Sequence, residues 1–192
     1  MSILVTGAAG FIGSYVSHAL TARGQTVIGV DNLNSYYPVS LKRARLERLL
    51  EATTFTFHQI AISDFTALEK IARAAGVTSI VHLAAQAGVR YSIEAPFTYG
   101  QSNLMGHMSV LEVARALKVN HLVYASSSSV YGANKEIPFS ESHRTDAPES
   151  LYGATKKADE LMSASYARLY DLPQTGLRFF TVYGPWGRPD MA

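Results

Sequence analysis

Thr6-Gly7-Ala8-Ala9-Gly10-Phe11-Ile12-Gly13 is the stretch that decides the fold, because it follows a short apolar run and opens an amphipathic segment. In a turn between a strand and a helix, Gly7 makes the tight bend and Gly10 lets the backbone approach a diphosphate, while Gly13 lets the helix pack closely on the strand. The anion then rests on the helix N-terminus, where free amide groups and the helix dipole favour negative charge. Three glycines at this spacing can also form a purely structural turn, but the flanking strand and helix favour a dinucleotide site.

Short apolar runs alternate with amphipathic segments along the whole chain, which predicts parallel strands joined by crossover helices. Strands are expected at residues 3–6, 26–30, 54–58, 79–83, 121–125 and 174–179. Helices are expected at residues 10–23, 40–51, 65–75, 98–117 and 150–170, and loops at 132–134 and 140–150. Because the strands are rich in Val, Ile and Leu, we expect helices on both faces of the sheet. The fold class is therefore α/β, a doubly wound parallel sheet of the Rossmann type, in one domain over residues 1–192.

Composition excludes several classes of function. The chain has 192 residues, of which 47% are hydrophobic and 17% charged, as expected for a folded domain. A formal net charge of +2 without a long basic run argues against nucleic acid or a membrane as partner. The chain has no cysteine and its six histidines lack metal-ligand spacing, so neither disulfide nor metal site is expected. With no signal peptide and no membrane-spanning run, we expect a cytoplasmic protein.

Asp31 closes the second predicted strand. A carboxylate at this place can accept hydrogen bonds from both ribose hydroxyl groups of an adenosine, and Asn32 can assist it. The same charge would repel a 2′-phosphate, so NAD is favoured over NADP as the cofactor. An aspartate after a strand can also simply cap a loop, but the glycine turn upstream favours the cofactor role.

Tyr152 and Lys156 stand four residues apart, so both side chains lie on one face of the predicted helix. A phenol is a poor base at neutral pH, but a neighbouring ammonium and a cationic nicotinamide ring would stabilise its phenolate. Lysine can also donate to the nicotinamide ribose. On its own the pair could simply lie on an exposed helix surface. The catalytic interpretation depends mainly on the glycine turn upstream.

Four consecutive serines, residues 126–129, follow the predicted strand 121–125. A serine run is often a flexible tract. Here it falls at the carboxyl edge of the sheet, beside the expected cofactor. A hydroxyl there can hold the substrate oxygen whose proton Tyr152 takes.

These motifs together resemble the extended short-chain dehydrogenase/reductase family, the NAD-dependent epimerases and dehydratases, over essentially the whole chain. Residues 31–37 (DNLNSYY), 83–90 (LAAQAGVR) and 178–191 (RFFTVYGPWGRPDM) resemble in particular the UDP-glucuronate 4-epimerases. The resemblance implies that Tyr152 removes the proton of a sugar 4-hydroxyl while C4 passes hydride to NAD. The 4-keto sugar then turns over and takes the hydride back on its other face, so UDP-glucuronate becomes UDP-galacturonate.

The resemblance also assigns roles to individual residues. The implied catalytic residues are Ser127, Tyr152 and Lys156. The implied cofactor contacts are Gly7, Gly10, Phe11, Ile12, Gly13, Asp31, Asn32, Ile62, Leu83, Ala84, Ala85, Asn103, Ala125, Ser126, Tyr152, Lys156 and Phe179. The implied substrate contacts are Arg90, Ser127, Ser128, Ser129, Tyr152, Phe180, Thr181 and Arg188. Both arginines are candidates because a guanidinium matches a carboxylate or a diphosphate, although either can equally be solvated surface charge.

The sequence departs from related patterns at several positions. Dehydratases and decarboxylases of the family carry acidic residues after the catalytic hydroxyl, where this chain has Ser128 and Ser129, so epimerisation is favoured. Thr181 replaces the asparagine of many galactose-type epimerases, which suits a sugar with a carboxylate. Ala61 replaces an acidic residue that usually touches adenine, so backbone at Ile62 is expected to supply that contact.

Family members continue into a carboxyl-terminal domain that clamps the sugar nucleotide, and the resemblance implies that this chain lacks it. Weak binding of a UDP-sugar and little turnover are then expected. Three functions stay open: a 4-epimerase, an NAD-binding module with little or no turnover, and a nucleotide-sugar dehydratase or decarboxylase. The family dimer uses helices equivalent to residues 98–117 and 150–170, so a homodimer is expected by analogy.

Overall fold

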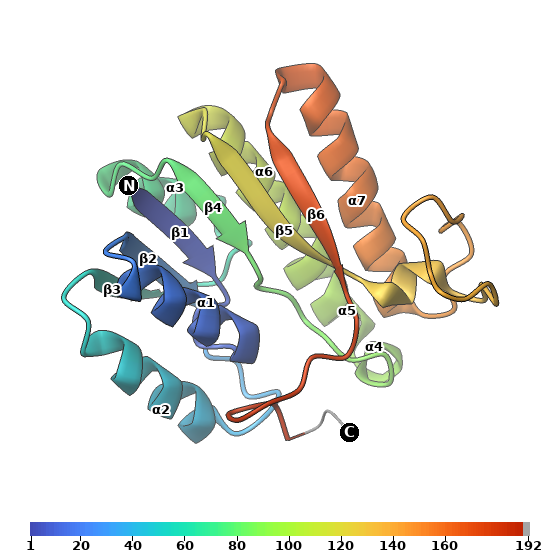
Figure 1. Cartoon of the computed structure of the whole chain (residues 1–192), viewed down its shortest axis with the longest axis horizontal. Helices are drawn as coiled ribbons and strands as arrows, with labels where there is room; N and C mark the ends of the chain where they lie inside the picture. The colour runs from blue at the N-terminus through green and yellow to red at the C-terminus, as the bar shows by residue number, and fades with distance from the viewer. Residues whose placement is uncertain (190–192) are drawn as a thin grey trace.

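Six parallel strands form a single sheet in the computed structural model, which describes residues 1–189 (Figure 1). Its strands are β1 (Ser2–Thr6), β2 (Thr26–Asp31), β3 (Phe55–Gln59), β4 (Ser79–His82), β5 (His121–Ser127) and β6 (Gln174–Phe179). They lie in the order β3-β2-β1-β4-β5-β6. The chain moves outward from β1 to β3 and then crosses back to β4, so a topological switch point lies between β1 and β4.

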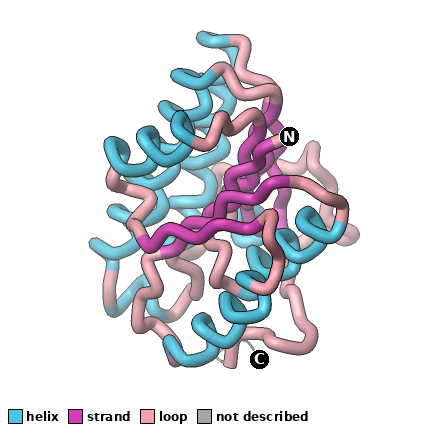
Figure 2. Tube along the Cα trace, turned by 90° about the vertical axis from the view of Figure 1, so that its left-hand side faces the viewer, coloured by secondary structure: helices cyan, strands magenta, loops and turns pink. Residues whose placement is uncertain are grey.

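Helices cover both faces of this sheet (Figure 2). They are α1 (Phe11–Ala22), α2 (Val39–Leu50), α3 (Phe65–Ala74), α4 (Tyr91–Glu94), α5 (Pro96–Tyr99), α6 (Gly106–Leu117) and α7 (Leu151–Tyr170). A π-helical segment, Gly100–Met105, joins α5 to α6, and a 3-10 turn, Ser128–Tyr131, follows β5.

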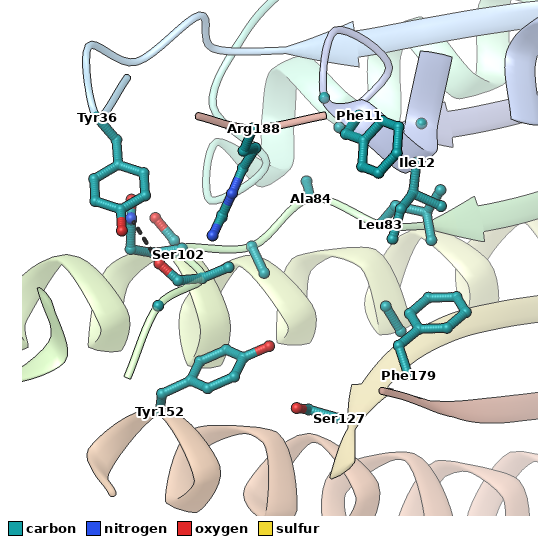
Figure 3. Close-up of a pocket in the computed structure, with 18 of the residues that line it drawn as sticks. Phe11, Ile12, Tyr36, Leu83, Ala84, Ser102, Ser127, Tyr152, Phe179 and Arg188 are labelled. Atoms are coloured by element: carbon teal, nitrogen blue, oxygen red, sulfur yellow. Dashed lines mark hydrogen bonds between the residues drawn. The ribbon is translucent and has the colours of Figure 1, made fainter. Parts of the chain in front are cut away.

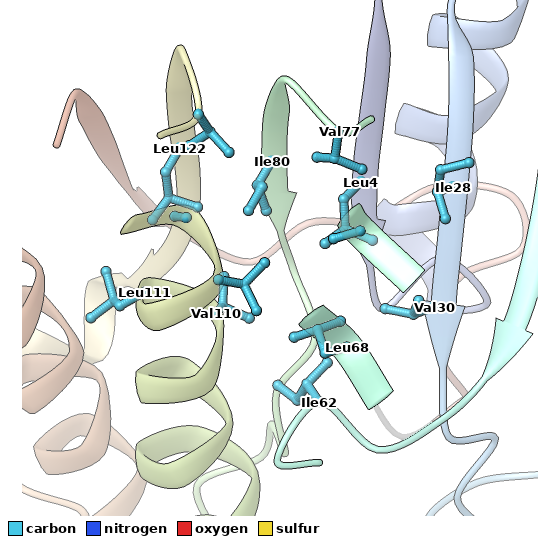
Figure 4. Packing of buried hydrophobic residues seen from close by; sticks show 14 of the residues in the cluster. Leu4, Ile28, Val30, Ile62, Leu68, Val77, Ile80, Val110, Leu111 and Leu122 are labelled. Carbon is cyan, nitrogen blue, oxygen red and sulfur yellow. The ribbon is translucent and has the colours of Figure 1, made fainter. Parts of the chain in front are cut away.

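Alternate residues of β1 pack against opposite helical layers. Ile3 is buried with Leu46 of α2 on one face. Leu4 is buried on the other face, in the cluster that includes Leu68 of α3 and Val110 of α6 (Figure 4). Each such aliphatic side chain gains about 1.5–3 kcal/mol from burial, so both faces of β1 hold the sheet in place. This burial explains why the strands are apolar without alternation.

The doubly wound parallel sheet predicted from the sequence is confirmed, and the element ends agree within two residues except in one helix. The predicted helix at 98–117 is wrong in detail, because it divides into the end of α5, the π-helical segment and α6. Gly106 starts α6 where a Cβ would lie 2.5 Å from Cδ1 of Ile62, so the helix approaches the β3–α3 loop closely there. The periodicity of apolar residues does not detect a wider turn of this kind.

No helix within residues 1–189 is long and apolar enough to cross a bilayer. Over the same residues, no cluster of three or more His, Cys, Asp or Glu side chains has the arrangement of a metal site.

Candidate active site

A cavity of about 410 Å³ opens at the carboxyl edge of the sheet and extends from the β1–α1 turn across β4 to the ends of β5 and β6. Its volume is in the range of small-molecule sites, and it lies at the switch point where doubly wound sheets bind ligands. The sequence-predicted residues that line it are Gly7, Gly10, Phe11, Ile12, Gly13, Asp31, Asn32, Ile62, Leu83, Ala84, Ala85, Ala125, Ser126, Ser127, Ser128, Ser129, Tyr152, Lys156, Phe179, Phe180, Thr181 and Arg188.

The glycine turn forms one end of the cavity. Gly7 has a φ of +70°, and a Cβ on it would lie 2.8 Å from the amide nitrogen of Ala84. A Cβ on Gly13 would lie 2.0 Å from the Gly7 carbonyl oxygen, so only glycine lets α1 start this close to the turn. Helix α1 has no side-chain cap and no acidic residue in its first turn. Its first amide groups are therefore available to an anion, as the sequence predicts.

Asp31 ends β2 beside this turn, with 8% of its surface exposed. Its Oδ1 accepts a hydrogen bond from the backbone amide of Leu33 at 2.8 Å. Burial raises the pKa of this carboxyl, against the opposing effects of the Leu33 hydrogen bond and the Lys42 charge. Asp31 lines the cavity, which fits a group that accepts hydrogen bonds from ribose hydroxyls.

Tyr152 and Ser127 lie at the other end of the cavity. Figure 3 shows their hydroxyl groups pointing toward each other, one from the start of α7 and the other from the end of β5. The Tyr152 ring is held edge-on against the ring of Tyr99, with centroids 6.2 Å apart. Ser150 caps α7 by accepting from the amide of Gly153, so the first turn that carries Tyr152 is fixed. A substrate hydroxyl placed between the two oxygens would reach both of them.

Lys156 lines the same end but its ammonium group is engaged within the protein. Its Nζ donates to the Ala125 carbonyl oxygen at 3.0 Å and to Oδ2 of Asp159 at 3.2 Å. Asp159 is 1% exposed, and its other oxygen, Oδ1, has no hydrogen-bond partner among the described residues. Burial raises the pKa of Asp159 to about 6, despite the neighbouring Lys156 charge. Sequence reasoning missed this carboxylate, although a position three residues after Lys156 on a helix was a usable signal.

Ser126 and Ser127 belong to β5, which corrects the expectation that the serine run follows the strand. They pair with Arg178 and Phe179 of β6, so the ladder continues two residues beyond the apolar run. The Ser126 hydroxyl donates to Glu160 at 2.7 Å, and Arg178 forms an ion pair with the same carboxylate at 2.9 Å. The side chain of Ser126 therefore joins β5 to α7.

The outer part of the cavity is formed by the β6 extension. Thr181 and Phe180 follow β6, and the Phe180 ring lies near the rings of Phe139 and Tyr131. Arg188 reaches the cavity from the carboxyl-terminal segment, with its guanidinium 5.5 Å from the centroid of the Tyr36 ring. The sequence motif that ends in Asp190 and Met191 continues outside the described residues.

Two predicted contacts do not line the cavity. Asn103 is 1% exposed. Its side-chain oxygen accepts a hydrogen bond from the Gln86 backbone amide, and its side-chain nitrogen donates to the Gln86 carbonyl oxygen and the Thr155 hydroxyl. It therefore fixes the loop after β4 against α7, and a cofactor contact by Asn103 stays a prediction. Arg90 is exposed at the start of α4, and its contact with a substrate stays a prediction.

Several lining residues were not predicted. They are Asn34, Tyr36, Tyr37, Lys42, Ile60, Gln86, Ala87, Gly88, Val89, Ser102 and Val182. Most lie in or next to the three stretches that carried the resemblance, which was the available signal. No sequence signal pointed to Lys42, because the conformation of the β2–α2 loop is what brings its side chain to the cavity. Its Nζ donates to the carbonyl and side-chain oxygens of Asn34.

The parallel sheet, its glycine turn and the acidic residue that ends β2 define a dinucleotide-binding domain of the Rossmann type. The sequence pattern of the NAD dependent epimerase/dehydratase family matches residues 3–192. The chain belongs to this family, whose cofactor is NAD, and both the predicted resemblance and the predicted cofactor are confirmed.

Curated relatives match the chain over its whole length. The chain is 55% identical over 192 residues to Protein CapI of Staphylococcus aureus, covering 100% of this chain and 57% of the relative. It is 53% identical over 193 residues to UDP-glucuronate 4-epimerase 2 of Arabidopsis thaliana, covering 44% of that protein. The chain thus spans about half the length of the curated relatives it matches.

A solved structure shares the fold closely. The UDP-glucuronic acid 4-epimerase from Bacillus cereus, in complex with UDP-glucuronic acid and NAD, superposes with a TM-score of 0.93 at 38% identity. The match covers 100% of this chain and 60% of that protein.

Proposed function

We propose that this chain supplies the NAD site and the reacting groups of a nucleotide-sugar 4-epimerase that interconverts UDP-glucuronate and UDP-galacturonate. One observation carries the proposal. The hydroxyl groups of Tyr152 and Ser127 point toward each other in the cavity that begins at the glycine turn. The names of the relatives from Arabidopsis thaliana and Bacillus cereus support the choice of sugar.

NAD fits the residues present, because a Cβ on Gly7 or Gly13 would fill the turn and Asp31 ends the neighbouring strand. The bound cofactor supplies a hydride acceptor and donor for C4 of the sugar. Tyr152 takes the proton of the sugar 4-hydroxyl and later returns it, and Ser127 holds that oxygen in place. The positive charge of Lys156 in the following turn stabilises the Tyr152 phenolate.

The substrate end of the cavity favours a sugar with a carboxylate. Ser128, Ser129 and Thr181 offer hydroxyl groups, and Arg188 offers a guanidinium that can pair with a carboxylate or a diphosphate. The two residues directly after Ser127 are serines and not acidic residues, so the extra proton transfers of elimination lack a group at this place to perform them. Epimerisation is therefore favoured over dehydration and decarboxylation.

The test uses this chain joined to the carboxyl-terminal part of the Staphylococcus aureus relative, which is 55% identical over the shared region. Incubation with UDP-glucuronate and NAD should yield UDP-galacturonate, separated by anion-exchange chromatography. The matched control is the same fusion with Tyr152→Phe. A folded fusion that binds NAD and gives no product, or that releases water or carbon dioxide, would contradict the proposal.

A second function, NAD binding without turnover, is favoured for residues 1–192 by the open substrate side. Phe180 is 56% exposed and Tyr183 is 91% exposed, so this side does not exclude water. Under this alternative NAD raises the melting temperature of the chain, whereas a UDP-sugar added afterwards changes nothing. A further rise with UDP-glucuronate would favour the epimerase site.

We also propose that α6 and α7 form a homodimer interface. Met105 and Met108 are 50% and 41% exposed near the start of α6, and Leu161 and Leu169 of α7 are 61% and 68% exposed. Large exposed apolar side chains on neighbouring helices are typical of a surface that another chain covers. Light scattering should give twice the chain mass, and Leu161→Glu should reduce it to the monomer.

A further inference from the structure

Arg45 is a buried cation that the proposed chemistry does not use. It lies on α2 and is 2% exposed. Its guanidinium donates to the Trp186 carbonyl oxygen at 3.1 Å through Nε, and again through Nη2. Through Nη1 it donates to the Ala9 carbonyl oxygen at 3.1 Å and to the Tyr37 hydroxyl at 2.7 Å.

These bonds join segments that are far apart in the sequence. Ala9 lies within the glycine turn, Tyr37 in the β2–α2 loop, and Trp186 in the carboxyl-terminal segment of residues 184–188. Arg45 therefore fixes the phosphate-binding turn relative to the segment that brings Arg188 to the cavity.

The backbone of this segment also requires support. Trp186 has a φ of +63°, a conformation that is costly for a side chain of this size. Its carbonyl oxygen accepts from Arg45, its ring lies 5.0 Å from the Arg48 guanidinium, and the Pro185 carbonyl accepts from Tyr15 at 3.0 Å. The segment is thus held in a strained shape by contacts from α1 and α2.

The charge of Arg45 is not neutralised by direct contact. All of its hydrogen-bond acceptors given above are neutral oxygens, and Arg45 forms no ion pair in the described part of the chain. Asp31 is the carboxylate that interacts with it electrostatically, and Lys42 acts on that carboxylate too. A buried cation without a contacting anion favours an anion placed nearby, and the proposed diphosphate would lie on the turn that contains Ala9.

We infer that Arg45 is a positioning residue that couples occupancy of the phosphate-binding turn to the position of residues 184–188, and thereby of Arg188. The coupling rests on the proposed NAD binding. A diphosphate on the turn stabilises the arrangement around Arg45, and the segment is then held more firmly over the cavity.

Trp186 provides the measurement, because it is the single tryptophan of the chain and lies within the segment. In the unliganded chain, Arg45→Met should shift its emission to longer wavelength and increase quenching by acrylamide. Arg43→Gln, on the exposed face of the same helix, is the matched control and should change neither. Far-UV circular dichroism and cooperative unfolding in urea show that each variant is folded.

Ligand titrations test the coupling itself. NAD, and inorganic pyrophosphate at higher concentration, should reduce acrylamide quenching of Trp186 in the wild-type chain. NAD affinity should fall about tenfold or more in Arg45→Met, since hydrogen bonds and charge are both lost. Arg45→Lys retains the charge without the planar fork, so it should keep more of the affinity while Trp186 behaves as in Arg45→Met.

The outcomes separate this inference from the proposed function. If calorimetry shows NAD binding but Trp186 quenching does not change, the coupling is wrong and the NAD site stands. If NAD fails to bind the wild-type chain, the proposed function fails, while the variants without ligand still test whether Arg45 holds the segment. Unchanged Trp186 emission in folded Arg45→Met refutes that role. If Arg45→Met does not fold, two measurements remain. Pyrophosphate that leaves Trp186 quenching unchanged in the wild-type chain refutes the coupling, and unchanged Trp186 emission in Arg45→Lys refutes the positioning role.

Discussion

Replacement of Asp159 by asparagine should change how the stability of this protein depends on pH. Asp159 is 1% exposed and contacts Lys156, and burial raises the pKa of its carboxyl from 3.8 to about 6. The folded state therefore holds the Asp159 proton more tightly than the unfolded chain does. Ionisation of this group lowers the free energy of unfolding as pH rises from about 4 to about 6, and the loss is complete above that range.

The size of this effect follows from the two pKa values. A rise from 3.8 to about 6 corresponds to about 3 kcal/mol in total, of which roughly half falls between pH 5 and pH 7.5. The difference in unfolding free energy, Asp159→Asn minus wild type, should grow by that amount over the same interval. Comparison with the variant is necessary because other groups titrate too. Burial lowers the pKa of His107 to about 3 and that of His82 well below its usual value, so both destabilise the folded state in acid.

Urea unfolding followed by circular dichroism at half-unit steps from pH 5 to pH 7.5 measures this difference. Glu149→Gln removes an exposed carboxylate near the start of α7 and serves as the control, with a difference that stays flat. A flat difference for Asp159→Asn, or one that grows toward acid, would show that Asp159 is already ionised in the folded state at pH 5. The interpretation of its burial would then be wrong.

Three further outcomes are expected at the candidate active site. Tyr152→Phe should lower epimerase turnover of the fusion protein by 10² to 10⁴, roughly the value of a general base, and change the calorimetric NAD affinity less than about threefold. Gly13→Ala should destabilise the chain by about 1–3 kcal/mol in urea unfolding, because its Cβ would lie 2.0 Å from the Gly7 carbonyl oxygen. Asp31→Asn should reduce the ratio of NAD affinity to NADP affinity about tenfold in competitive binding. Removing one negative charge near the 2′-phosphate should change the relative free energy of NADP binding by about 1.4 kcal/mol, which corresponds to that ratio. Equal preferences before and after this change would contradict the role of Asp31.

Local patterns in the sequence were sufficient for the fold. Apolar runs and glycine spacing gave all six strands, because buried parallel strands and the β1–α1 turn each depend on neighbouring residues. The pattern failed where a long-range contact decides the geometry. Gly106 packs closely on Ile62, and the turn that precedes it is the wider π-helical segment. Ser126 and Ser127 extend β5 because β6 pairs with them.

The candidate site was predictable to the extent that its residues belong to motifs. Ser127, Tyr152 and the glycine turn were found in this way, and the structure brings them to one cavity. Asp159 and Arg45 were missed because their importance depends on burial, which one sequence without its fold does not reveal. Arg45 belongs to a short basic stretch, residues 42–45, from which no prediction was made, yet it is among the largest fully buried side chains.

Charge at the two ends of the cavity differs in a way that bears on how the proposed cofactor is oriented. Toward the Tyr152 end, two cations have contacting carboxylates: the buried Lys156 with Asp159, and the partly exposed Arg178 with Glu160. Around the glycine turn, by contrast, both Lys42 and Arg45 interact electrostatically with the carboxylate of Asp31. An oxidised nicotinamide carries positive charge and a diphosphate carries two negative charges, so NAD laid with its diphosphate on the turn places each charge where the protein favours it. The reverse orientation keeps the diphosphate near the turn but exchanges the two nucleosides. It would place the cationic nicotinamide ring near Asp31, where one carboxylate interacts with two cations, Lys42 and Arg45. Charge therefore favours the orientation in which the adenosine lies near Asp31 and the nicotinamide ring lies near Tyr152, where both cations have contacting carboxylates.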